Sequence, residues 1–290
     1  MSVPVADAWC AVGPRLSPAG GVVITGIDLS QPLSPALRQR IFEAFLAHQF
    51  VVFPGQILSR EAQFAFTANF GEVEHPEARR AQGKRVRVAH VISNLDSAGN
   101  PVDRSASAVS NYHWHTDKSY HPAPPMMTTL YGVELPAAGG DTAFANTALG
   151  YAALPEATKR HIAGLRVVFR WGATLGTPVA PQTAAEEPGN PPPVDHPLAR
   201  THPDTGVAAL YLGNHASHIL GLPAAEGASL LAALLAHTTQ PEFVYTHRWR
   251  PGDLVMWDNR CLLHRAVANY EMGRERRILH RTVVRGSVPL

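Results

Sequence analysis

The stretch Tyr112-His113-Trp114-His115-Thr116-Asp117 contains the pattern His-x-Asp. In an extended segment, residues i and i+2 point to the same face, so the His115 imidazole and the Asp117 carboxylate can converge on one metal ion. A site needs a third ligand, and His264 in the segment 257–265 is the best candidate. Two histidines and one carboxylate form the facial triad of non-haem Fe(II) oxygenases, although zinc uses the same ligand types. The sequence therefore predicts a metal site and leaves both metals open.

Two arginines near the carboxyl end form a second pattern. Arg277 and Arg281 lie four residues apart, so on a strand they share one face with residue 279. Two guanidinium groups that face a barrel interior are costly unless each meets an anion. Surface ion pairing is the more common role of arginine, and it remains an alternative here. Arg276 is expected to point outward into solvent.

Taken in chain order, these motifs resemble the taurine dioxygenase and 2,4-dichlorophenoxyacetate dioxygenase family. The matching elements are His115-x-Asp117, Gly139-Gly140-Asp141-Thr142, Trp257-Asp258-Asn259-x-x-x-x-His264, and Arg277 with Arg281. The resemblance spans about residues 26 to 286. It implies an Fe(II)- and 2-oxoglutarate-dependent dioxygenase, which hydroxylates a substrate C–H bond while 2-oxoglutarate and O₂ give succinate and CO₂.

The resemblance also implies roles for individual side chains. The two histidines and the aspartate of the triad would bind iron and form the catalytic centre. Arg277, with a hydroxyl from Thr142, would hold the distal carboxylate of 2-oxoglutarate, where a bidentate guanidinium fits. Arg281 would bind the acid group of the substrate. Further substrate-binding candidates that the resemblance supplies are Asn111, His202, His215, His218 and His75.

Composition restricts the remaining functional classes. The chain has 290 residues, of which 45% are hydrophobic and 17% charged, so a substantial core is available. A formal net charge of +2 predicts neither nucleic-acid nor membrane binding. Two distant cysteines and the lack of a signal-peptide pattern or a long apolar run favour a cytoplasmic location. The resemblance further implies a homo-oligomer, either a dimer or a tetramer.

The pattern of elements predicts a mainly β fold with flanking helices, within a single domain over 1–290. Helices are expected after the Ser34-Pro35 cap and over 59–70, 146–165 and 223–237. Strands are expected over 21–27, 49–53, 86–92, 128–135, 165–171, 198–202, 207–212, 243–249, 253–257 and 277–284. Many short strands favour a jelly-roll, also called a double-stranded β-helix or cupin-like fold, which the family resemblance implies as well. Another β-rich α+β fold is the alternative.

Residues 172–197 are rich in proline and poor in large apolar side chains. Such a segment cannot bury a core, so a long mobile insertion is expected, either as a functional lid or as simple disorder. For the whole chain, the expected substrate is a small organic anion that resembles an aryloxyalkanoate or a sulfonate. A zinc hydrolase and a non-catalytic jelly-roll that binds a ligand are the alternative functions.

Overall fold

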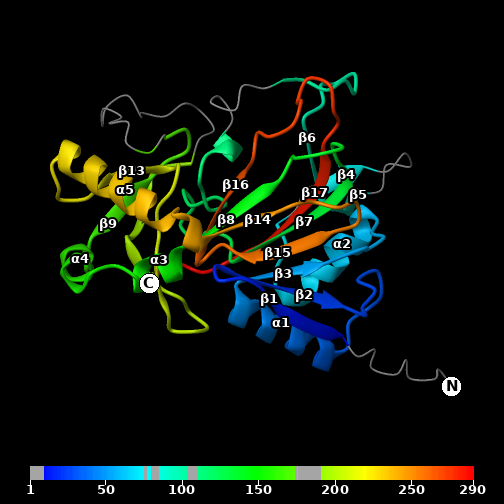
Figure 1. Cartoon of the computed structure of the whole chain (residues 1–290), viewed down its shortest axis with the longest axis horizontal. Coiled ribbons are helices and arrows are strands. Elements are labelled where there is room, and N and C mark those ends of the chain that lie inside the picture. Colours follow the sequence, from blue (N-terminus) through cyan, green and yellow to red (C-terminus); the bar gives the residue numbers. More distant parts are fainter. Residues whose placement is uncertain (1–9, 75–76, 80–84, 104–109, 174, 176–190) are drawn as a thin grey trace.

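A seven-stranded sheet forms the frame of the molecule in the computed structural model, which describes residues 10–74, 77–79, 85–103, 110–173, 175 and 191–290 (Figure 1). Its neighbours are antiparallel except for a parallel pair between its second and third strands. In spatial order, the strands are β1 (Ala11–Ser17), β2 (Gly20–Thr25), β3 (Phe50–Phe53), β15 (Leu254–Asp258), β7 (Met127–Glu134), β17 (Ile278–Val284) and β6 (His90–Ser93).

A three-stranded sheet packs against the large sheet and closes the interior. Its strands, in order, are β14 (Val244–His247), β8 (Thr142–Asn146) and β16 (Leu262–Ala266), all antiparallel. Side chains from both sheets form one buried cluster, which includes Phe50, Leu130, Phe144, Trp257 and Leu279. Two antiparallel sheets that share a core in this way form the expected jelly-roll.

Strand β15 shows how the large sheet is covered on both faces. Leu254 and Met256 pack with the helices outside the sheet, while Val255 and Trp257 belong to the interior cluster. Successive residues of a strand point to opposite faces, so burial on both sides requires an unbroken apolar run. The run Leu254-Val255-Met256-Trp257 meets this requirement.

Two helices cover the outer face of the large sheet, namely α1 (Pro35–His48) and α2 (Arg60–Thr67) (Figure 1). The predicted cap of the first is confirmed, because the Ser34 hydroxyl accepts a hydrogen bond from the Leu37 N–H at 3.2 Å. Ser59 caps the second helix in the same way. Ile41, Phe45 and Phe66 anchor the two helices on the sheet.

A second core lies beyond the small sheet, where β9 (Arg166–Phe169) pairs with β10 (Val194–Pro197) and β13 (Ala216–Ile219). Helix α5 (Ala224–Thr238), with α3 (Thr147–Ala152) and α4 (Glu156–Ile162), packs there. The break expected at Pro155 separates α3 from α4. The remaining elements are β4 (Glu77–Arg79), β5 (Arg85–Arg87), the hairpin of β11 (Ala199–Thr201) and β12 (Ala208–Leu210), and short 3-10 helices at Ala68–Phe70, Ser110–Tyr112 and Pro241–Phe243.

The expected insertion over 172–197 is wrong at its carboxyl end. Val194–Pro197 is strand β10, and its His196 lies opposite Val167 of β9 in an antiparallel register. The His196 side chain is buried and bonds the Ser119 carbonyl through Nε2 at 3.0 Å. The expectation of mobility falls mainly on residues 174 and 176–190, which lie outside the described residues. No helix in the described part of the chain has both the length and the apolar character that a bilayer span requires.

Candidate metal centre and cosubstrate pocket

The two histidines of the predicted triad face each other across a backbone ladder. His115 and His264 form an antiparallel bridge, in which the His115 N–H donates to the His264 carbonyl at 3.0 Å and the reverse bond is 2.8 Å. Side chains of such a pair emerge on the same face of the sheet. Their imidazole rings accordingly lie with centroids 4.2 Å apart.

Asp117 completes the group from two residues beyond His115. One ligand atom from each of the three residues lies within 4.8 Å of the others, and all three residues are buried. The His264 Nε2 and the Asp117 Oδ1 are 3.9 Å apart. The structure thus brings together the three side chains that the His-x-Asp spacing and the distant histidine suggested.

The orientation of His115 suits a metal ligand. Its Nδ1 lies 2.8 Å from the carbonyl oxygen of His113, and a carbonyl can only accept a hydrogen bond. The Nδ1 therefore carries the proton, which leaves the lone pair of Nε2 for a metal ion. A histidine ligand is commonly fixed through its other ring nitrogen in this way. The Nδ1 of His264 finds no hydrogen-bond partner among the described residues.

The protonation states also suit a divalent cation. Burial, with a smaller contribution from His115, lowers the pKa of His264 to about 3, and burial lowers the pKa of His115 as well. Burial alone would raise the pKa of Asp117, but the charge of Arg281, the two histidines and the Thr128 hydrogen bond together hold that pKa well below its usual range. At neutral pH the site offers two neutral imidazoles and one carboxylate, so no proton has to leave when a metal binds.

A pocket opens beside the triad. Its polar lining includes Arg277, Arg281, Thr142 and Asn111, as the sequence suggested for all four, and its apolar lining includes Ile92, Leu130 and Leu279. The two arginines reach the same pocket because 277, 279 and 281 share one face, as the strand periodicity predicted. Arg276 points away and pairs with Glu134 at the surface.

Arg277 is buried in this pocket, and the described residues provide it with no partner of opposite charge. Its Nε donates to the Gly140 carbonyl at 2.8 Å, and no carboxylate of the described residues lies within ion-pair distance. Burial lowers its pKa. Gly140 has a φ of +67°, and a Cβ there would approach the Arg277 Cδ to 3.1 Å. The Gly139-Gly140 pair therefore lets the backbone come close to the guanidinium.

Thr142 adds a hydrogen-bond donor to the same pocket. Its hydroxyl oxygen accepts a bond of 3.0 Å from the Trp249 indole N–H, which can only donate. The hydroxyl proton is thus free to donate to a ligand, such as an anion held by Arg277.

Arg281 has an internal partner in this structure. Its Nη1 lies 3.3 Å from the Asp117 Oδ1, and the side chain is only partly buried. The contact is an ion pair with a buried carboxylate, not the surface ion pair that was the alternative role. The guanidinium nevertheless lines the pocket beside the triad.

The other substrate candidates are spread over several places. His215 is buried against Tyr120 and Trp171, and burial lowers its pKa to about 4. His218 is exposed on β13 and contacts Ser217, so the structure does not bring it to the pocket. His75 lies outside the described residues.

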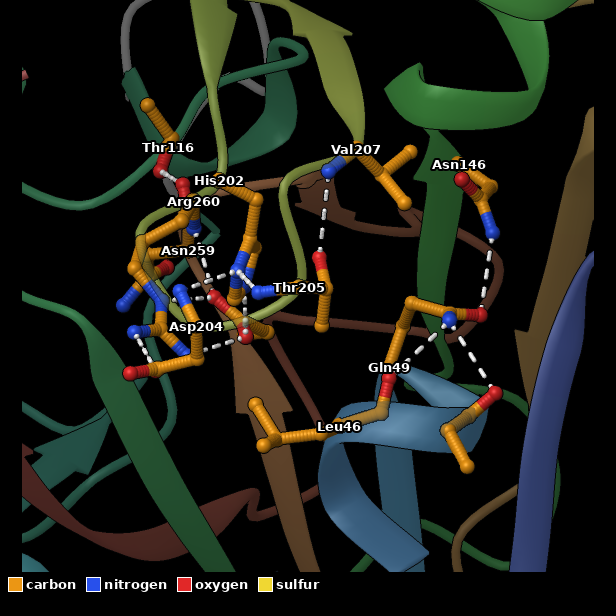
Figure 2. A network of polar contacts seen from close by, with 12 residues as sticks. Leu46, Gln49, Thr116, Asn146, His202, Asp204, Thr205, Val207, Asn259 and Arg260 are labelled. Carbon is orange, nitrogen blue, oxygen red and sulfur yellow. Dashed lines mark hydrogen bonds and ion pairs between the residues drawn. The ribbon is translucent and has the colours of Figure 1, made fainter. Parts of the chain in front are cut away.

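His202, which lies beside Asp204 and Thr205 in Figure 2, belongs to a second polar cluster with Asp258 and Cys261. The backbone N–H groups of Asp204 and Thr205 both donate to its Nδ1, so its Nε2 carries the proton and donates to Asp258 at 2.9 Å. His202 therefore does not line the pocket beside the triad.

The bonding within this second cluster disfavours a second metal centre. Asp258 also accepts two bonds from the Arg260 side chain, at 2.8 and 2.7 Å. Burial raises the pKa of the Cys261 thiol well above its ordinary value. The carboxylate and histidine atoms are already used within the protein, and the cysteine is not a thiolate. We assign the cluster to the stability of the β15–β16 turn.

Thr128 contacts the metal site and was not singled out from the sequence. Its hydroxyl donates to the Asp117 Oδ2 at 2.5 Å from within β7. No local signal marks it, because it lies eleven residues from Asp117 and is one of two adjacent threonines in that strand.

A profile of the "Taurine catabolism dioxygenase TauD, TfdA family" matches residues 14–283, and the chain belongs to this family. It is 37% identical to an α-ketoglutarate-dependent 2,4-dichlorophenoxyacetate dioxygenase of Cupriavidus pinatubonensis, over 94% of this chain and 97% of that protein. It is 33% identical to an α-ketoglutarate-dependent sulfate ester dioxygenase of Pseudomonas putida, over 93% and 88% of the two chains. The structure of AAD-2 with Mn(II) and N-oxalylglycine superposes with a TM-score of 0.82 at 32% identity, over 96% and 99%. The resemblance inferred from the motifs and the jelly-roll fold are confirmed.

Proposed function

We propose that the chain is an Fe(II)- and 2-oxoglutarate-dependent dioxygenase that hydroxylates a C–H bond of a small organic anion and releases succinate and CO₂. The observation that carries this proposal is one pocket lined by both histidines of the His-Asp-His triad and by a buried arginine that has no carboxylate partner among the described residues. A zinc hydrolase needs a triad of this kind but has no use for the buried guanidinium. A ligand-binding jelly-roll without catalysis needs no metal ligands.

In this proposal, each group of residues in the pocket has a separate role that follows from its chemistry. An iron(II) ion bound by the triad would supply the activation of dioxygen. Arg277 and Thr142 hold and orient the distal carboxylate of 2-oxoglutarate, because both present donors to the same cavity. The apolar side chains of Ile92, Leu130 and Leu279 exclude water around them.

Arg281 determines the class of the substrate in this proposal. A metal ion bound by Asp117 would neutralise that carboxylate and leave the guanidinium for a substrate anion. Relatives named for aryloxyalkanoate and sulfate ester substrates support an aryloxyalkanoate- or sulfonate-like substrate. His215, with its aromatic neighbours, and Asn111 remain candidates for further contacts.

The test uses the purified protein with Fe(II), with Zn(II) and without metal. Anaerobic addition of 2-oxoglutarate to the Fe(II) protein should produce a weak charge-transfer band in visible light, and Asp117→Ala should abolish it. Aerobic incubation with a panel of aryloxyalkanoates and alkyl sulfonates or sulfates should then yield succinate that depends on the substrate. Ester hydrolysis by the Zn(II) form without 2-oxoglutarate would instead support the zinc hydrolase.

The wider setting of the enzyme belongs to the same proposal. We expect a single domain, a cytoplasmic location and a homo-oligomer, without a nucleic-acid or membrane partner. Light scattering coupled to size-exclusion chromatography would distinguish a dimer or tetramer from a monomer.

A further inference from the structure

We infer that Thr128 is a positioning residue that holds Oδ2 of Asp117, so that Oδ1 alone faces the metal. The inference rests on the proposed function, because it concerns the same metal site. It assigns a task to a side chain that is not a ligand and that lies beyond the His-x-Asp motif.

Hydrogen bonds connect Trp257, Asn259, Thr128 and Asp117 in series. Their directions are fixed because the Trp257 indole at one end can only donate and the Asp117 carboxylate at the other can only accept. The Trp257 indole can only donate, so the Asn259 Oδ1 at 3.0 Å is the acceptor and its Nδ2 is the donor. That Nδ2 donates to the Thr128 hydroxyl oxygen at 2.9 Å. The single hydroxyl proton is therefore left for the Asp117 Oδ2, which can only accept.

Asn259 is itself held by its main chain. Its N–H donates to the Met126 carbonyl, and its carbonyl accepts a 2.8 Å bond from the Thr116 hydroxyl (Figure 2). Thr116 stands between the two metal ligands of the His-x-Asp motif. Asn259, which directs the Thr128 hydroxyl, is thus bonded on one side to Met126, immediately before the strand that contains Thr128, and on the other side to Thr116, between the two ligands.

Thr128 is also well placed to act as a fixed support. It is fully buried on the inner face of β7, opposite Trp257 of β15 and Val283 of β17. Two neighbouring strands restrain its backbone, so the Cα from which its side chain extends stays in place if the carboxylate turns. The Asp117 Oδ1, on the other side of the carboxylate, lies 3.9 Å from the His264 Nε2.

This arrangement matters for the number of positions that remain on the metal. A carboxylate that binds through one oxygen uses one coordination position and leaves the others for cosubstrate and O₂. Hydrogen bonds to ligating carboxylates fix their orientation, and losing such a partner typically weakens metal affinity by about 10- to 100-fold. Thr128 is the side chain that fixes the orientation of Asp117.

The experiment measures Mn(II) affinity of the full chain without substrate or O₂, from the electron paramagnetic resonance signal of free Mn(II). Thr128→Val keeps the shape and removes the donor, and it should weaken binding by about 10- to 100-fold. Thr128→Ser restores the hydroxyl and should bind within about threefold of wild type. Thr129→Val is the matched control, because Thr129 is equally buried on the same strand but bonds Thr67 and Thr282 on the outer face.

The outcomes separate the inference from simpler explanations. Unchanged or tighter Mn(II) binding by Thr128→Val overturns it, as does equal weakening in Thr129→Val, which would indicate a general packing effect. Failure of the serine variant to restore binding also overturns it. If Asp117→Ala binds Mn(II) like wild type, the metal site itself fails, and with it the proposed function.

Discussion

Arg277 shows most directly why the pocket needs an anion. It is 9% exposed, burial lowers its pKa, and the described residues place no carboxylate within ion-pair distance of it. Burying an arginine without an anionic partner is unfavourable, so a site of this kind is maintained for a ligand. The next residue, Arg276, has its partner Glu134 at the surface.

Arg277→Leu should raise the Michaelis constant for 2-oxoglutarate while leaving Mn(II) affinity near that of wild type. The loss of charge-assisted hydrogen bonds costs about 1.5–3 kcal/mol, or roughly ten- to a hundredfold. Arg276→Leu is the control, since it removes the same charge one residue away at the surface. Equal effects of the two substitutions would show that general charge, and not the pocket, attracts the cosubstrate.

Arg281→Gln should reduce the preference for an acidic substrate over its amide. Wild type is expected to turn over the carboxylate far better, and the variant should lose about ten- to a hundredfold of that preference, because a hydrogen bond to a charged group disappears. Succinate formation with each substrate measures the ratio. Because Arg281 also contacts Asp117, Mn(II) affinity is measured in parallel. A wild-type enzyme that uses acid and amide equally would contradict the assignment.

The residues of the site differ in how visible they are in the sequence. His115 and Asp117 could be predicted because their spacing alone places them on the same face of an extended segment. His264 could be predicted from the order of the family motifs. Thr128 could not, because its contact with Asp117 depends on how β7 lies against the metal loop. His202 was placed at the substrate side, but the turn at 203–206 directs its ring to Asp258.

At the scale of elements, the turn between β15 and β16 determines where His264 lies. Asp258, at the end of β15, accepts bonds from the Arg260 side chain, the Arg260 N–H and His202. Arg260 in turn bonds Asp204 in the β11–β12 hairpin (Figure 2). Asp258 and Arg260 are both buried, so each of these charged side chains needs the other as its partner.

Asp258→Asn should therefore destabilise the protein by about 3–5 kcal/mol, because it removes the charge that pairs with the buried Arg260 and replaces one of the two acceptor oxygens with an NH₂ donor. Urea unfolding monitored by tryptophan fluorescence gives the free energy. Asp195→Asn is the matched control, since Asp195 pairs with Arg166 at the surface with roughly half of each side chain exposed. That substitution should cost about 1 kcal/mol or less. Similar losses for both variants would contradict a structural role for the cluster.

Helices were easier to predict from the sequence than several strands. Ser34 and Ser59 mark helix starts by local chemistry, and the apolar spacing that follows needs no distant partner. Strand β10 was missed because three prolines precede it, and β16 because His264 and Arg265 interrupt its apolar pattern. These strands are stabilised by neighbours far along the chain, so composition within the segment does not reveal them.

At the scale of the whole molecule, the histidines should make the metal-free protein less stable in acid. The folded pKa of His264 is about 3, compared with 6.5 for the free side chain, so the unfolded chain takes up the proton first. The stability that this histidine contributes is complete above about pH 6.5 and is lost as the pH falls toward 3. Between pH 7.5 and 5 the loss should be about 2 kcal/mol.

The measurement compares urea unfolding of the EDTA-treated wild type and His264→Gln at pH 7.5 and 5. Other histidines contribute to both proteins, so the difference between the two curves isolates His264. The variant should lose about 2 kcal/mol less than wild type over this interval. Identical pH dependence in the two proteins would show that His264 is protonated as easily in the folded state as in the unfolded one.

The strand order of the large sheet is likewise a property of the whole chain. Strand β15 lies between β3 and β7, although these segments are far apart in sequence, and the patterns of the individual strands cannot specify such neighbours. The jelly-roll itself followed from the family motifs together with the abundance of short strands.

The paired hydrogen bonds between His115 and His264 have a consequence for how this scaffold diversifies. Peptide groups, which every residue type shares, set the spacing of the two imidazoles. Mutations that reshape the pocket walls therefore leave that spacing intact. A lineage can accumulate changes at pocket-lining positions such as Ile92 or Leu130 and explore new substrates without rebuilding its reactive centre. Relatives named for 2,4-dichlorophenoxyacetate and for sulfate esters, at 37% and 33% identity, are the outcome expected when pocket walls change around a spacing that the main chain sets.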